Sequence, residues 1–207
     1  MRIVSRARVQ FLSALAMAAV PILPAAACRP IKQARAASAS AAHYTATGAA
    51  YNKKGAVPKL QVPTGYRTSY EYLGSWAIAA DSGRGSKQLH EVYASPGTIE
   101  AFRKTGGFKN GTVLVKEVYE TSTAPMTTGI VSRAGTLKGW FVLVRDTEND
   151  HPGNMLWGDG WGWGWFDRGN PTRTTSTNFK SDCLACHVPA RATEWIYTSG
   201  YRPLQDK

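Results

Sequence analysis

The pattern of apolar and polar positions predicts a chain made largely of β-strands. Alternating or β-rich runs, bounded by Gly, Pro, Asn and Asp, occupy residues 75–80, 89–94, 111–120, 139–146 and 154–166. A short helix is predicted between the second and third runs, where Ser95 can cap, Pro96 suits the first turn and Gly106 can end it. The expected architecture is an antiparallel sheet with a few short helices, an α+β fold.

A second helix is expected near the C-terminus. It would begin at Cys183 or just beyond, and its most regular part would run from Thr193 to Thr198. The chain would therefore end in a helix that carries the Cys and His residues discussed below.

The segment from Trp161 to Trp165 alternates Trp with Gly, so a strand here would have one tryptophan face and one nearly bare face. A bare face suits the close approach of a flat macrocycle or of a neighbouring backbone. Equally, the tryptophans could pack in the core or in a subunit contact while the glycines form a bulge. The pattern leaves both interpretations open.

Residues 1–27 have the layout of a secretory signal peptide. Three arginines precede an apolar run from Phe11 to Leu23, and small residues follow up to Ala27. The run is interrupted by proline and is too short to span a bilayer comfortably. Cleavage after Ala27 would leave Cys28 first, either as the site of a lipid anchor or as an incidental cysteine. We therefore expect export to the periplasm.

Most of the positive charge lies in this leader. The 207-residue chain has a net charge of +11, but its first 40 residues hold six Arg or Lys and no acidic residue. The remainder carries only +5 without a long basic run, which indicates an ordinary solvated surface and gives little support to nucleic-acid binding. The composition of residues 28–57 indicates a flexible lead-in, and residues 58–207 are expected to form a single folded domain.

The strongest chemical signal is the motif Cys183-Leu-Ala-Cys186-His187. A structural zinc site needs four ligands, and the one other cysteine, Cys28, lies at the signal peptide. A thioredoxin-like redox pair needs a βαβ unit, for which the twenty residues after the motif leave no room. Covalent haem explains each residue, because the thiols add to the porphyrin vinyl groups and His187 binds the iron. One haem c is the expected cofactor.

The other axial position of the iron has no obvious protein ligand. The candidates are His43, His90, Met126, His151 and Met155. Three of these lie in expected loops or in the lead-in, and the other two lie in or beside strands, where core or rim positions are the common interpretation. We therefore expect an open iron site that binds a gas or a small substrate.

Lys116 is the other residue with chemical potential. On a strand it would share a face with Leu114 and Val118, and burial of that face would lower its pKa and leave a neutral, nucleophilic amine. Composition alone favours the alternatives, in which the side chain reaches water or marks an exposed edge strand.

With these residues in hand, the chain resembles the cytochrome P-460 family, whose relatives include the cytochromes c-prime-beta. The matching segments are HEVYASP, FKNGTVLVKEVYE, WGWGWF and DCLACHVPARATEWIYTSGYRPL, spread over roughly residues 60–205. The resemblance implies a β-dominated homodimer in which His187 is the proximal ligand of a five-coordinate c-type haem facing a small distal cavity.

The resemblance also implies two alternative activities. In the P-460 branch a lysine, matched here by Lys116, bonds to the porphyrin edge, and the enzyme oxidises hydroxylamine, with or without nitric oxide, towards nitrous oxide or nitrite. In the c-prime-beta branch that bond is missing, and the protein binds nitric oxide or carbon monoxide without an established turnover. The first expectation is a periplasmic oxidoreductase that passes electrons to a soluble or membrane acceptor. The distal carboxylate that some members use as a proton relay has no match here.

Overall fold

The computed structural model of the chain describes residues 59–80, 82–83 and 87–205. Several sequence features lie outside these residues: the expected signal peptide (1–27), the expected lead-in (28–57), Cys28 and His43. Among the described residues, no helix is both long and apolar enough to cross a bilayer.

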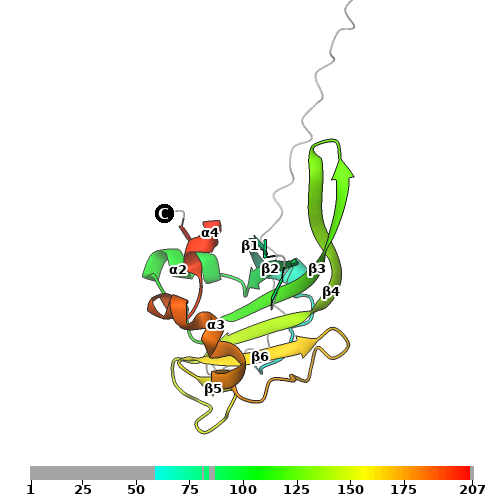
Figure 1. The fold of residues 1–207 in the computed structure, drawn as a ribbon. Helices are drawn as coiled ribbons and strands as arrows, with labels where there is room; N and C mark the ends of the chain where they lie inside the picture. The colour runs from blue at the N-terminus through cyan, green and yellow to red at the C-terminus, as the bar shows by residue number, and fades with distance from the viewer. Residues whose placement is uncertain (1–58, 81, 84–86, 206–207) are drawn as a thin grey trace, which may run out of the picture. The chain divides into compact units, whose positions relative to one another are not determined.

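Six antiparallel strands form one sheet in the order β1-β2-β3-β4-β6-β5 (Figure 1). The strands are β1 (Glu71–Ala77), β2 (Gln88–Ala94), β3 (Val113–Met126), β4 (Gly129–Arg145), β5 (Trp157–Gly158) and β6 (Trp161–Asp167). Each predicted run therefore contributes to a strand, and the α+β fold is confirmed. β3 and β4 are longer than predicted because their pairing continues, through register shifts, to the hairpin turn after Met126.

Short helices complete the fold: α1 (Tyr66–Ser69), α2 (Thr98–Thr105), η1 (Lys180–Leu184), α3 (Ala185–His187), η2 (Val188–Thr193), η3 (Thr198–Gly200) and α4 (Arg202–Gln205). In Figure 1, α2, α3 and α4 gather on the same side of the sheet, while the β3–β4 hairpin runs on past the ends of the neighbouring strands. These three helices cover one face of the sheet, and this face carries the candidate site.

α2 is confirmed as a helix, but its start differs from the prediction. Ser95 and Pro96 both precede it, and the capping position is Gly97, with φ of 78°. Backbone N–H groups at the start of the helix donate instead to the carboxylate of Glu71, at 2.8 and 3.0 Å. Because Glu71 is distant in sequence, local patterns did not signal this cap. Gly106 ends the helix as predicted, with φ of 78°.

The sheet has a separate apolar core on each face. We call one the motif face; its core joins the sheet to the helices and includes Leu73, Val92, Leu114, Trp161, Trp163 and Cys183. The core of the opposite face includes Val62, Tyr66, Val115, Trp140, Val142 and Phe166. Alternate residues of β3 and β6 face different cores, which explains why β3 begins with a run of apolar residues that enter both cores.

The structure decides between the two interpretations of the Trp/Gly segment. Trp161 and Trp163 are 0% and 1% exposed and pack in the core of the motif face. The glycine face does not meet a macrocycle, because the indole of Trp157 lies there, 2.7 Å from where a Cβ on Gly162 would stand. His151 stacks on Trp157 with ring centroids 3.7 Å apart. The chain thus fills its bare face with its own aromatic ring.

A methyl group at Gly162 should disturb this packing, because the indole is held in place by the stacked imidazole. We expect Gly162→Ala to lower the free energy of unfolding by about 2 kcal/mol, measured by urea denaturation followed by tryptophan fluorescence. Gly169→Ala is the matched control, since no atom lies within 4 Å of its added Cβ. Equal stability of the two variants would contradict the close packing.

A buried charged network lies on the opposite face. The side chain of Glu117 on β3 is 0% exposed. Its carboxylate accepts hydrogen bonds from the hydroxyl of Tyr66, from Arg67 Nε at 2.6 Å and from the hydroxyl of Tyr119 at 3.0 Å. The Nη2 atom of Arg67 adds an ion pair at 2.5 Å. These bonds join the short helix α1 to the middle of the sheet.

Candidate functional site

The Cys-x-x-Cys-His motif lies across two short helical segments, η1 and α3, and η2 follows it directly, so no single regular helix carries it. Cys183 is buried in the core of the motif face, Cys186 is exposed, and no disulfide joins the two thiols. Asp182 anchors the entry, since its carboxylate accepts the N–H groups of Thr177 and Asn178 at 2.8 and 3.1 Å. These hydrogen bonds lower the pKa of Asp182 to about 2, and the bond from the backbone N–H of Thr177 has the largest effect. The turn that carries both thiols is therefore fixed at its start.

The expected helix from Thr193 to Thr198 is wrong. The chain reverses there, because Glu194 and Trp195 adopt positive φ values of 55° and 67°. Two contacts with the sheet hold the reversal: Arg145 Nη2 pairs with the Glu194 carboxylate at 2.7 Å, and Trp161 Nε1 donates to the Glu194 carbonyl at 3.0 Å. The reversal turns the backbone of Trp195 back towards the motif.

The imidazole of His187 is oriented by this reversal. Its Nδ1 donates to the carbonyl oxygen of Trp195, 2.6 Å away, and its ring meets Trp163 edge-on with centroids 5.0 Å apart. Burial lowers the pKa of His187, and the charge of Lys116 acts in the same direction, while the bond to Trp195 opposes them. Nε2 is thus left unprotonated, in the arrangement typical of a metal-binding histidine whose other nitrogen donates to a carbonyl.

Lys116 lies in the interior of the sheet, since β3 runs between β2 and β4. The edge-strand interpretation is therefore wrong. Its face neighbours Leu114 and Val118 are 3% and 2% exposed, and its Nζ stands 4.5 Å from the ring centroid of Phe141. Burial lowers the pKa of Lys116 to about 8, although negative charge on the motif thiols would act in the opposite direction. The structure thus favours a half-buried, readily deprotonated amine.

The fold brings Lys116 close to the motif, from which it is far in sequence. Its charge interacts with the thiols of Cys183 and Cys186 and with the imidazole of His187. Half-buried apolar side chains pack against the core of the motif face, which includes Cys183: Trp76, Leu143 and Leu184. A covalently attached haem fits this arrangement. The site offers two thiols three residues apart, an imidazole with an unprotonated nitrogen, and apolar side chains on the same face.

Of the four candidate axial ligands within the described residues, only His90 lies on the motif face, where it pairs with Val118 of β3. Met126 and Met155 are 60% and 56% exposed, the first at the end of the hairpin strand β3. His151 stacks on Trp157, over the glycine face of β6. The structure therefore separates His90 from the other three.

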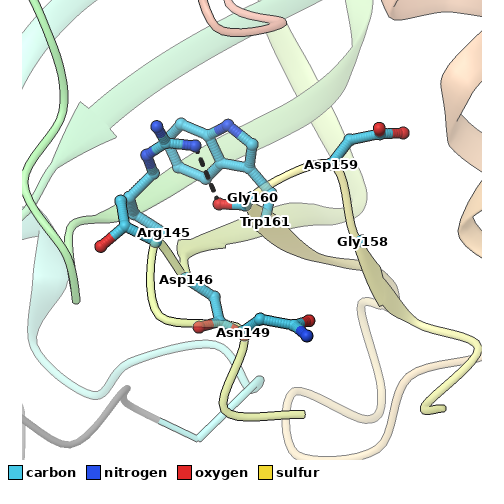
Figure 2. A pocket seen from close by; sticks show the side chains of 8 residues that line it. Arg145, Asp146, Asn149, Gly158, Asp159, Gly160 and Trp161 are labelled. Carbon is cyan, nitrogen blue, oxygen red and sulfur yellow. Dashed lines mark hydrogen bonds between the residues drawn. The ribbon is translucent and has the colours of Figure 1, made fainter. Parts of the chain in front are cut away.

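A hollow of about 420 Å³ lies elsewhere, at one end of β4 and β6 (Figure 2). It is lined by Arg145, Asp146, Thr147, Asn149, Gly158, Asp159, Gly160 and Trp161. In it the guanidinium of Arg145 donates to the carbonyl of Gly160 at 3.0 Å, the bond drawn in Figure 2. None of the lining residues belongs to the motif, so this hollow is distinct from the candidate haem site.

Sequence reasoning missed two residues that shape the site. Trp195 acts through its backbone carbonyl, and no residue type signals such a role. Tyr197 donates its hydroxyl hydrogen to the carbonyl of Cys186 at 2.7 Å, and its ring centroid lies 6.2 Å from that of His187. The sequence signal for both was the resemblance of the segment after the motif to the family pattern.

Comparison with known proteins gives the chain its family. A family model described as Cytochrome P460 matches residues 63–198, whereas no curated protein matches the chain. The matched segment covers more than half of the chain and includes His90, Lys116 and the whole Cys183–His187 motif. The family is one of haem c proteins, in agreement with the geometry of the motif. The chain therefore belongs to the cytochrome P460 family.

Proposed function

We propose that this protein oxidises hydroxylamine or a related nitrogen oxide at a haem c whose distal side is open. The observation that carries the proposal is Lys116, a half-buried amine on the motif face whose charge acts on His187 and on both thiols. According to the resemblance described above, a lysine bonded to the porphyrin edge is present in the hydroxylamine-oxidising P-460 branch and missing from the gas-binding c-prime-beta branch. A lysine in the interior of the sheet, beside the haem motif, supports membership of the oxidising branch.

The motif residues would hold the cofactor. Cys183 and Cys186 would form the two thioether bonds, and Nε2 of His187 would bind the iron. When bound, the haem supplies an iron atom that can accept electrons from a nitrogen ligand. The chain contributes orientation, because Trp195 fixes the imidazole and Trp163 meets its ring edge-on.

The contribution of Lys116 depends on its neutral form. With its pKa lowered to about 8, about half of the amine is neutral at pH 8, whereas an ordinary lysine would be about 0.3% neutral. The lone pair of the neutral amine is what a bond to a porphyrin carbon requires. Burial of Lys116 therefore favours the chemistry that the oxidising branch needs.

The proposal also includes location and partners. The signal-peptide layout of residues 1–27 supports export to the periplasm, where c-type haem is attached, with a lipid anchor at Cys28 as an alternative. By resemblance, we propose a homodimer that delivers electrons to a soluble or membrane acceptor. The modest charge of the chain after the leader gives no support to a nucleic-acid partner.

Replacement of Lys116 tests this function. Lys116→Met keeps an unbranched side chain one atom shorter but removes the amine. We therefore expect haem attachment to persist, the reduced absorption spectrum to shift and hydroxylamine oxidation to be lost. The assay is steady-state turnover with an artificial electron acceptor. Lys138→Met is the control, because this lysine pairs with Glu120 at the protein surface. An unchanged spectrum in Lys116→Met would remove the covalent bond from the proposal.

A gas-binding function is the alternative, and one observation favours it. The buried acidic side chains among the described residues are Glu117 and Asp146. Glu117 enters the network with Tyr66 on the opposite face, and Asp146 bonds to His151. Neither carboxylate is therefore placed as a proton relay on the motif face. Tight nitric oxide binding without hydroxylamine turnover would favour this alternative. A low-spin, six-coordinate iron that does not bind carbon monoxide when reduced would indicate a function in electron transfer only.

A further inference from the structure

His90 occupies a distinctive position on the motif face. Directly paired residues of antiparallel strands point to the same face and form rows across the sheet. Trp163 of β6, which contacts His187, and Leu114 of β3 stand in the same row, because both pair with Leu143 of β4. This row marks the side of the sheet nearest to the proximal imidazole.

Lys116 and His90 stand in successive rows beyond it. Lys116 is two residues further along β3 than Leu114, and Val118, the partner of His90, is two residues further again. Successive rows are about 7 Å apart along the strands. His90 also lies on β2, across β3 from β4 and β6. Seen from the row of Trp163, His90 therefore lies beyond Lys116 both along the strands and across the sheet.

Lys116 interacts with both imidazoles. Its charge lowers the pKa of His187 and also that of His90. If Lys116 marks the edge of the porphyrin, as the proposed function requires, the two histidines lie on opposite sides of it. The side away from His187 is the distal side, where a substrate would bind.

The chemistry of His90 suits a proton acceptor. Its Nε2 lies 3.2 Å from Oε1 of Gln88, so Nε2 donates its hydrogen there and Nδ1 keeps an unshared lone pair. Burial, together with the charge of Lys116, lowers the pKa of His90 to about 4. The imidazole is therefore neutral at pH 7, and its unshared lone pair can accept a hydrogen bond.

Few other charged groups face His90. On β3 the same face carries Lys116 and, one row beyond His90, Glu120, which pairs with Lys138 of β4 at 3.4 Å. From β1, the residue opposite His90 is Trp76, which does not titrate. Among the described residues, the other titratable groups nearby are Tyr197 and Tyr201, whose rings lie 6.5 and 5.9 Å from that of Trp76, and Asp167, at the β6 end of the row. Lys116 is the charge that governs His90.

We infer that His90 is the polar group on the distal side of the haem site, where Nδ1 accepts a hydrogen bond, and then a proton, from an N–H or O–H group of the substrate. The proton converts the imidazole to imidazolium and leaves to solvent, and no electron passes through the side chain. The inference rests on the proposed function through Lys116, which marks the porphyrin edge, but the test of the position of His90 below needs no substrate. His90 would thus supply the proton transfer that family members with a distal carboxylate obtain from that group.

Infrared spectroscopy of the reduced, carbon monoxide-bound holoprotein tests the position of His90. An imidazolium donates a hydrogen bond to bound carbon monoxide and lowers its stretching frequency, so a lower-frequency band should grow as the pH falls. The midpoint should lie below the ordinary histidine value of about 6.5. His90→Leu should give one pH-independent band, and His90→Gln, which preserves a hydrogen-bond donor, one pH-independent band at lower frequency. His151→Leu is the control and should keep the pH dependence.

The contrary results are equally definite. A wild-type band that does not change with pH, or an unchanged titration in His90→Leu, would overturn the inference. So would a six-coordinate, low-spin iron that becomes five-coordinate in His90→Leu, because His90 would then be an axial ligand. If hydroxylamine oxidation is found, His90→Leu should slow it about 100-fold. If it is absent while the bands still titrate, the proposed function fails and the position of His90 stands.

Discussion

Replacement of both motif cysteines, Cys183→Ala with Cys186→Ala, should yield a colourless protein even when it is made with an intact cytochrome maturation pathway. Both thioether bonds are then lost, and His187 alone does not hold the porphyrin covalently. The measurements are the visible spectrum and the intact mass, which should equal that of the mature polypeptide. Each single variant keeps one thiol and is expected to keep some covalently bound haem.

The control for this experiment is the wild-type protein, which should be heavier than its polypeptide by the mass of one haem. A coloured double variant with haem in covalent linkage would contradict the assignment of Cys183 and Cys186. A wild-type protein without haem, produced in the same cells, would refute the haem c assignment altogether.

The second large effect is expected in the buried network at Glu117. Arg67→Met should lower the free energy of unfolding by about 3 kcal/mol, because the Glu117 carboxylate is then buried without a cation. Urea denaturation of the holoprotein measures the loss. Urea is preferable to guanidinium because it adds no ions that would screen the charges.

A double variant supplies the control. Arg67→Met combined with Glu117→Gln removes both charges and should recover part of the lost stability, since the amide can still accept from the hydroxyl of Tyr66. Tyr119→Phe removes one hydrogen bond to the carboxylate and should cost only about 1 kcal/mol. Unfolding of Arg67→Met at the wild-type urea concentration would contradict an energetic role for the ion pair.

The strands could be predicted because their signal is local. The apolar start of β3 reflects a sheet with a core on each face, and the alternation of Trp and Gly in β6 reflects its two different faces. Both patterns are visible in short segments. The haem ligands were equally visible, because Cys183, Cys186 and His187 are neighbours in the chain. The resemblance to the family pattern then indicated that these segments belong to one domain.

Features that depend on distant residues could not be predicted. The start of the helix α2 depends on Glu71 of β1. The chain reversal at Glu194 depends on Arg145 of β4 and Trp161 of β6. Composition favoured a Lys116 side chain that reaches water or marks an exposed edge strand. The local sequence does not determine the order of strands in the sheet, so it could not show that β3 is an interior strand. The position of His90 relative to that lysine required the register of β2 against β3.

The reversal after the motif has a consequence for how such proteins diverge. The groups that orient His187 from its own segment, the carbonyl of Trp195 and the ring of Tyr197, lie within ten residues of it. Lys116 and His90 belong to separate strands of the sheet. Substitutions on the strands can therefore change the surroundings of the motif while the segment that holds Cys183, Cys186 and His187 stays unchanged.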